Sequence, residues 1–409
     1  MTSLRASIAA ALALTLAVSA RAQVDPNHRQ LVQLGWDQPI SGGPAIGYGF
    51  YYLNRPDFYR PDATLRLVVA PVYFDSEVAL VQIAPHTNLG IGAAGGGFAY
   101  GHTEIRGGSV KGDESFLGHG FSVALSIYRR LNPGRMIPLH AVFRGASAVV
   151  AFGRRGGTDP DFTLPRDHLV HSARIGLRFG GRDPDQGKPA LELSGWLEGK
   201  FRNRETQFGY GDRPLRQDSQ FAWLHGYFAY TFPETGRYAS LGATLGTSSN
   251  ADRLNAWRLG GSLPLVSEFP LSLPGYAHQE VTARSFAWTE LRLLQPVDRD
   301  RRLGVGVWGA MSTADYLPGF EQAGSLNSGV GGWGQYERPS GRWRVAVQYG
   351  YGVQAVRKAE RGAHSVGMTV QIRLGAPQWP LPFDPRAPSE QPRGGYAPVG
   401  GRLLPEIIR

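Results

Sequence analysis

The residues closest to a catalytic arrangement are His168, His171 and Ser172, in the stretch DHLVHSAR. Adjacent residues of a β-strand point to opposite faces, so His171 and Ser172 cannot serve one site. His168 and Ser172 share a face, but four strand residues separate them by about 13 Å. The acidic pairs in DPDF and DRD are typical of solvated loops, and the chain has no cysteine. We expect no catalytic residue, no cofactor and no metal site, and we do not expect an enzyme.

Charged residues recur inside stretches that alternate between apolar and polar positions. In HSARIGLRFG, for example, Ile175 and Leu177 lie on one face and Arg174 and Arg178 on the other. An Arg or Lys facing lipid at the membrane midplane costs about 2–4 kcal/mol, so the charged face should line an interior. Either the charges pair and fill that interior, or they form a basic, anion-preferring constriction. The candidate lumenal charges are Arg174, Arg178, Glu192, Glu198, Lys200, Glu290, Arg292, Arg344 and Arg373.

The alternating stretches predict the element that positions these charges. About fourteen of them between residues 45 and 374 predict an all-β protein, a transmembrane antiparallel β-barrel, with twelve or sixteen strands as alternatives. Connections after odd-numbered predicted strands are mostly long, and those after even-numbered strands are mostly short. A barrel with both termini in the periplasm predicts this sorting, whereas a soluble β-sandwich does not. The connection after the second predicted strand is the exception.

The two ends of the chain differ from the barrel. Residues 1–22 have Arg5, an apolar run and Ala20-Arg21-Ala22, which predict a secretory signal peptide cleaved after Ala22. Residues 23–44 are expected to form a short periplasmic segment, and the Pro-rich residues 375–409 a disordered periplasmic tail. The expected location is therefore the outer membrane of a Gram-negative bacterium.

Net charge restricts the expected partners. The formal charge is +10, but a secreted chain rarely meets nucleic acid, so we expect no nucleic-acid partner. The expected partners are outer-membrane lipid and lipopolysaccharide. Periplasmic proteins that bind the N- or C-terminal segment are a further hypothesis.

The longest predicted connection, residues 248–283, contains the apolar stretch RLGGSLPLVSEFPLSLPGYAHQE. A loop this apolar should not extend into water, so we expect an extracellular loop that folds back into the lumen. Its expected tip is Pro274, Gly275 and Tyr276.

Three short motifs of this region resemble the BamA/TamA-like surface-antigen superfamily: Gly260-Gly261, Gly275-Tyr276 and Glu290-Leu291-Arg292. In that family the loop before the fifth-last strand carries an Arg-Gly-Tyr or Arg-Gly-Phe tip that docks inside a sixteen-stranded barrel. Five predicted strands follow the tip here, and the resemblance covers residues 256–374. It implies a transport or membrane-assembly barrel that acts with separate periplasmic partners. The alternative is a passive, weakly anion-preferring pore or a structural barrel.

The sequence departs from the family pattern at the tip. Pro274 occupies the place of the arginine, and the segment VGVWGAMST lacks the carboxylate that would pair with it. Because both charges are absent, no buried charge is left without a partner. We expect the loop to dock through Leu271, Leu273 and Tyr276 instead. No POTRA domain is predicted between the cleavage site and the first strand.

Overall fold

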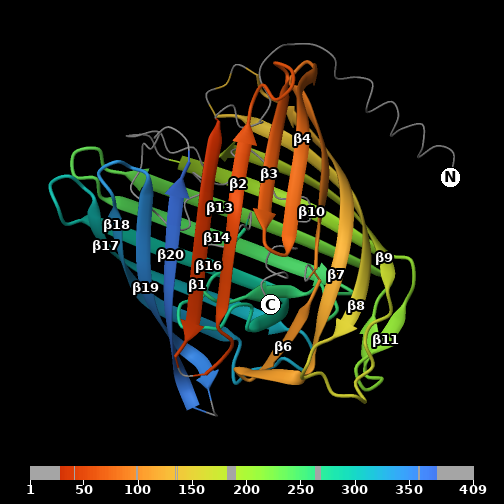
Figure 1. Ribbon diagram of the computed structural model, residues 1–409. Coiled ribbons are helices and arrows are strands. Elements are labelled where there is room, and N and C mark those ends of the chain that lie inside the picture. Colours follow the sequence, from red (N-terminus) through yellow and green to blue (C-terminus); the bar gives the residue numbers. More distant parts are fainter. Residues whose placement is uncertain are drawn as a thin grey trace.

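The computed structural model describes residues 28–40, 42–97, 100–133, 135, 137–181, 190–262, 269–357 and 360–374. Within these residues the chain forms one 18-stranded sheet and a separate two-stranded sheet, with no helices. Sixteen of the 18 strands form a closed antiparallel barrel, because the last strand pairs with the first (Figure 1). No helix in the described part of the chain is long and apolar enough to cross a membrane. The predicted signal peptide and C-terminal tail lie outside the described residues.

The barrel strands pair with their neighbours in chain order. They are β1 (Arg29–Pro39), β2 (Ile46–Arg55), β3 (Ala63–Ala70), β4 (Tyr73–Ala84), β5 (Thr87–Gly96), β7 (Ser109–Arg130), β8 (Leu139–Arg154), β9 (His168–Gly181), β10 (Ala190–Arg202), β13 (Asp218–Thr231), β14 (Tyr238–Ser249), β16 (Val281–Pro296), β17 (Leu303–Tyr316), β18 (Leu326–Glu337), β19 (Trp343–Arg357) and β20 (Glu360–Arg373). Four short strands lie in the connections: β6 (His102–Arg106), β11 (Thr206–Phe208), β12 (Arg213–Leu215) and β15 (Trp257–Leu259). β6 pairs with β7, β15 pairs with β16, and β11 and β12 form the separate sheet.

The two faces of the barrel wall differ in chemistry. Exposed positions of the strands carry large apolar side chains, such as Val123, Ile175 and Leu197. Buried positions, which point into the barrel, carry polar and charged side chains such as Arg66 and Glu290. An apolar outer face and a polar interior are typical of a barrel whose outer wall contacts lipid.

The predicted count of fourteen strands is wrong, because two strands were not recognised. β1 lies within residues 23–44, which are predicted to form a periplasmic segment but instead contribute the first barrel strand, and β4 lies in the connection after the second predicted strand. β4 points Asp75 and Glu77 inward, where Arg66 of β3 lies 2.6 Å and 3.7 Å from their carboxylates. Two carboxylates on the inward face make β4 hard to recognise as a strand from its sequence alone. Recognising β4 divides the exceptional connection into two short turns, 71–72 between β3 and β4 and 85–86 between β4 and β5, so β3–β4 remains a short connection at the loop end.

The connections define two ends of the barrel. We call the end with the connections β2–β3, β7–β8, β13–β14, β16–β17 and β18–β19 the turn end; Arg29 of β1 and Arg373 of β20 also lie there. The opposite, loop end has the long connections, including 155–167, 203–217 and 250–280. β6 and β11 lie at this end, at the lower rim in Figure 1.

Candidate functional site

The connection between β14 and β16, residues 250–280, is the longest between barrel strands. Its two arms are joined by backbone hydrogen bonds: the Gly260 N–H donates to the Leu271 carbonyl (2.9 Å), and the Leu273 N–H to the Gly261 carbonyl (3.0 Å). Leu273 is fully buried. Residues 263–268 of the predicted loop lie outside the described residues. The described arms therefore form a folded unit rather than an extended surface loop.

The predicted tip lies against β18 and β19 at positions without side chains. Gly275 has a φ of 78°, and a Cβ added to it would overlap the backbone nitrogen of Gly352. A Cβ on Gly350 would lie 2.5 Å from the Gly275 nitrogen. The Tyr276 ring lies 2.9 Å from the position that a Cβ on Gly352 would take. Glycine on both sides is what allows the two backbones to come this close.

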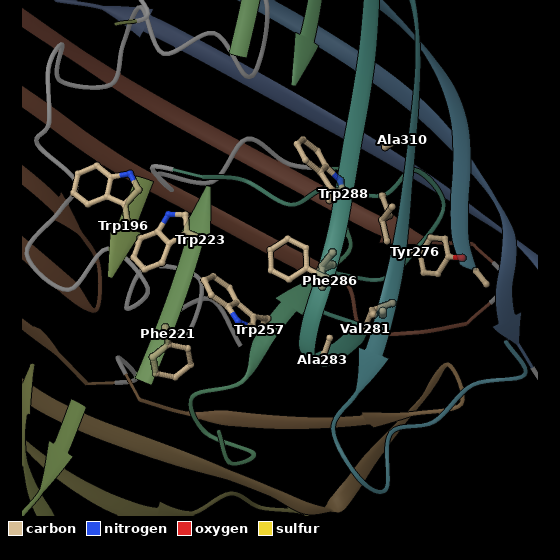
Figure 2. Close-up of a cluster of buried hydrophobic side chains, with 14 of the residues drawn as sticks. Trp196, Phe221, Trp223, Trp257, Tyr276, Val281, Ala283, Phe286, Trp288 and Ala310 are labelled. Carbon is tan, nitrogen blue, oxygen red and sulfur yellow. The ribbon is translucent and has the colours of Figure 1, made fainter. Parts of the chain in front are cut away.

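The loop shares one buried cluster with the inward-facing side chains of the wall. Leu273 and Tyr276 belong to it, together with Phe286 and Trp288 of β16 and buried residues of β4, β7, β8, β10, β13, β17, β19 and β20. The Trp288 indole N–H donates to the Ser272 carbonyl at 2.8 Å. Figure 2 shows Tyr276 on one side of β16 and the tryptophans of the cluster on the other. The loop is thus held against the wall by a shared cluster of buried apolar side chains and by a hydrogen bond.

Aromatic side chains of the barrel wall pack against the second arm of the loop, residues 269–280. Trp196 of β10 and Trp223 of β13 are stacked with ring centroids 6.0 Å apart. Phe269 of the loop lies edge-on at 5.9 Å from both. The guanidinium of Arg174 lies 5.0 Å from the Trp223 ring. Aromatic edge contacts and a cation over a ring stabilise this contact beyond the burial of apolar area.

A buried ion pair holds the end of the loop that joins β16. The Arg357 guanidinium of β19 donates to both carboxylate oxygens of Glu280, each at 2.6 Å. Arg357 Nε also donates to the Gly42 carbonyl in the β1–β2 connection (2.8 Å). Neither Glu280 nor Arg357 is among the residues predicted from the sequence. The available signal was the acidic residue that ends an otherwise uncharged segment, residues 269–280.

The other arm of the loop contacts strands on both sides of β20. The Ser262 N–H donates to the Asp37 carboxylate of β1 at 3.1 Å. The Ser262 carbonyl accepts a hydrogen bond from the Gln348 amide of β19 at 3.0 Å. Because β20 pairs with both β1 and β19, the loop bridges the strands that flank the closing strand.

The first part of the loop is bound to the β6 hairpin at the loop end. The Arg253 guanidinium forms an ion pair with Glu104, and the His102 ring lies 2.8 Å from the second Glu104 oxygen. Arg258 contacts the other His102 nitrogen at 3.1 Å. Burial raises the pKa of Glu104, but the His102 hydrogen bond and the nearby charges of His102, Arg253 and Arg213 outweigh it and lower the pKa to about 2. Glu104 is therefore a carboxylate at neutral pH.

The candidate lumenal charges are mostly ion-paired. Arg292 lies 3.1 Å from Glu290 on the same face and stacks on Trp308, with its guanidinium 4.5 Å from the ring centre. The other pairs are Arg174–Glu198 at 3.1 Å, Arg178–Glu192 at 3.2 Å, Lys200–Glu198 at 3.8 Å and Arg344–Glu337 at 4.0 Å. Arg373 is half-buried at the turn end. Of the two arrangements considered for these charges, the structure has the one in which opposite charges pair and fill the interior, and not a constriction lined by basic residues.

The histidines that resembled a catalytic site lie apart in the structure. His171 contacts Ser147 of β8 (2.9 Å), not Ser172, and this pair is exposed on the outer face of the wall. The His168 ring bonds instead to the Arg166 carbonyl (2.8 Å). Cross-strand pairing therefore selects a partner that sequence spacing along one strand could not reveal.

Comparison with known proteins gives matches by structure alone. No family model and no curated protein matches the sequence. CdiB from Acinetobacter baumannii superposes with a TM-score of 0.56 at 10% identity, over 84% of this chain and 60% of that chain. CdiB from Escherichia coli gives 0.56 at 12% identity, over 88% and 68%. BamA from Haemophilus ducreyi lacking POTRA domains 1–3 gives 0.50 at 9% identity, over 84% and 70%.

The fold of this chain is therefore similar to that of the CdiB and BamA barrels, the fold expected from the resemblance. The sixteen strands and the five strands that follow the 250–280 loop agree with the expectation from the resemblance. The chain spans 60% of the length of the first of these structures.

Proposed function

We propose that this protein is a transport or membrane-assembly barrel of the outer membrane in which the 250–280 loop closes the lumen. The proposal rests on one observation: the backbone at Gly275 packs directly against inward-facing glycines of β18 and β19. A tip held by backbone contact, an ion pair and a shared buried cluster is a plug rather than a surface loop.

The loop end is proposed to be extracellular and the turn end periplasmic, because both ends of the described chain lie at the turn end. This orientation requires export by the predicted signal peptide with cleavage after Ala22. Work with separate periplasmic partners would then occur at the turn end. Lipopolysaccharide would surround the loop end.

The alternative, a passive and weakly anion-preferring pore, has less support. Paired charges such as Arg292–Glu290 and Arg178–Glu192 produce little net field along the lumen. A plugged barrel also predicts low conductance, whereas a passive pore needs an open path.

Single-channel conductance of the refolded mature protein in a planar bilayer tests the proposal. The backbone nitrogen of Glu280 lies 3.1 Å from the position that a Cβ on Gly260 would take, so a short Gly-Ser linker can replace residues 262–279. We expect the intact barrel to be nearly silent and this replacement to open stable channels. A comparison variant lacks residues 206–215, the β11–β12 hairpin, which forms no sheet with a barrel strand although Arg213 pairs with Glu114 of β7; it should stay nearly silent, because the 250–280 loop is still present. Equal conductance of the intact and loop-replaced proteins would reject the plug.

A further inference from the structure

The turn end carries an excess of arginine over one arc of the barrel. The connections β13–β14, β16–β17 and β18–β19 have the sequences FPETGR, VDRDRR and RPSGR, which together contain six arginines and three carboxylates. At the opposite end of the same arc, the described residues of 250–280 and 317–325 contain two arginines and three carboxylates. The basic charge of this arc is therefore concentrated at the turn end.

Most of these arginines have no carboxylate partner. Among the described residues, ion pairs within 4.0 Å connect Arg302 with Asp300, but none involves Arg237, Arg299, Arg301, Arg338 or Arg342. The side chains of these five arginines are exposed. Charges that the protein leaves without counter-charges on one rim are available to an anion from outside.

The turns that carry the arginines are held together. The Arg301 guanidinium donates to the carbonyls of Pro233 (2.8 Å) and Glu234 (2.6 Å) in the adjacent turn. Arg237 Nε donates to the Gln295 side chain at 2.7 Å. Asp298 accepts the Leu303 N–H at 2.7 Å, which occupies part of its carboxylate within the turn. A rigid rim presents its cations at less entropic cost than flexible loops would.

An outward-facing aromatic band lies directly beside this rim. Phe228 and Phe232 of the β13 region are 44% and 47% exposed, and Tyr230 contacts Phe232 with ring centroids 4.8 Å apart. Tyr336 contacts Trp343 at 5.7 Å on the neighbouring strands β18 and β19. Of these side chains, Tyr230, Tyr336 and Trp343 have both an apolar ring and a polar group, and such side chains favour the boundary between hydrocarbon and headgroups. The arginines therefore lie at the level where lipid phosphates begin.

We propose that this rim, formed by Arg237, Arg299, Arg301, Arg338 and Arg342, binds the phosphodiester headgroups of anionic phospholipids in the leaflet at the turn end. The planar guanidinium matches two phosphate oxygens at once, which an ammonium group does not. The aromatic band contacts the acyl chains of the same lipid. An acidic protein could use the cations but not the aromatic band, so lipid accounts for both features.

Native mass spectrometry of the full barrel in detergent, with added phosphatidylglycerol or phosphatidylcholine, tests this site. The variant Arg299→Gln/Arg338→Gln/Arg342→Gln removes three rim charges. The control Arg155→Gln/Arg166→Gln/Arg204→Gln removes three exposed arginines at the loop end, which likewise form no ion pair with a carboxylate among the described residues. Both should retain the heat-modifiable band of a folded barrel.

We expect the rim variant to bind phosphatidylglycerol at least about tenfold more weakly, since each Lys or Arg close to an anionic lipid surface strengthens binding. The control should bind as the unmodified protein does, and phosphatidylcholine binding should not change. Glycerophosphoglycerol, which lacks acyl chains, should fail to displace the lipid; displacement at similar concentrations would show a soluble-phosphate site and overturn the lipid assignment. Unchanged lipid binding by the rim variant would also overturn the proposal. An acidic protein would then be the better candidate for the partner of this rim.

Discussion

Arg357 donates hydrogen bonds to both carboxylate oxygens of Glu280, and both side chains are buried. Through the Gly42 carbonyl the same guanidinium reaches the β1–β2 connection. One residue of the second-last strand thus joins the loop to the first hairpin of the barrel. The family pattern expected an arginine in the loop; here the loop supplies the acid and the wall supplies the arginine.

Replacing Arg357 with Ala should destabilise the barrel by about 3–5 kcal/mol, because Glu280 is left as a buried charge without its partner. The measurement is urea unfolding in lipid vesicles followed by tryptophan fluorescence. The matched control is Arg284→Ala, which breaks the exposed Arg284–Asp315 pair and should cost at most about 1 kcal/mol. Equal losses in the two variants would contradict the importance of the buried pair.

Replacing Gly275 with Ala should displace the tip, since the added Cβ overlaps the Gly352 nitrogen and the φ of 78° disfavours any side chain. We expect higher single-channel conductance and a stability loss of about 1–3 kcal/mol from overpacking. Gly199→Ala in β10 is the control, because a Cβ there meets nothing within 4 Å. A silent Gly275→Ala channel would mean that the tip does not close the lumen.

The Glu290–Arg292 pair allows a double-variant test. Arg292→Met alone should cost about 3–5 kcal/mol, because Glu290 stays buried without its counter-charge. Adding Glu290→Leu should recover most of that loss, since an apolar pair of similar volume does not need to be desolvated as ions. Denaturant midpoints of the three variants measure this coupling. Additive losses in the double variant would show that Arg292 acts mainly through its contact with Trp308.

Protonation of Glu104 should loosen the loop end in acid. Its pKa is lowered from 4.5 to about 2 in the folded state, so it binds a proton more readily when unfolded. Its stabilising contribution is therefore complete above about pH 4.5 and is lost as the pH falls towards 2. Hydrogen exchange of residues 100–116 should increase over that range. Glu104→Gln should remove the pH dependence; if it persists, another carboxylate is responsible.

The sequence alone determined the class of fold. Period-two alternation in stretches such as HSARIGLRFG, with arginines on the polar face, required a closed wall with an apolar outside. The same alternation placed Arg174, Arg178, Glu290 and Arg292 on the inner face, where the structure has them paired. The apolar character of residues 258–280 predicted a folded loop, because an exposed apolar segment is unfavourable in any barrel.

Only the tertiary structure decided the exact strand count and the long-range partners of individual residues. β1 and β4 became strands because their neighbours supply hydrogen bonds, and β4 keeps Asp75 and Glu77 inside because Arg66 of the adjacent strand neutralises them. The partners of Glu280, Ser147 and Gly275 lie 77, 24 and 77 residues away along the chain. Such contacts depend on strand register and barrel closure, and these are set by the whole sheet rather than by any one stretch of sequence.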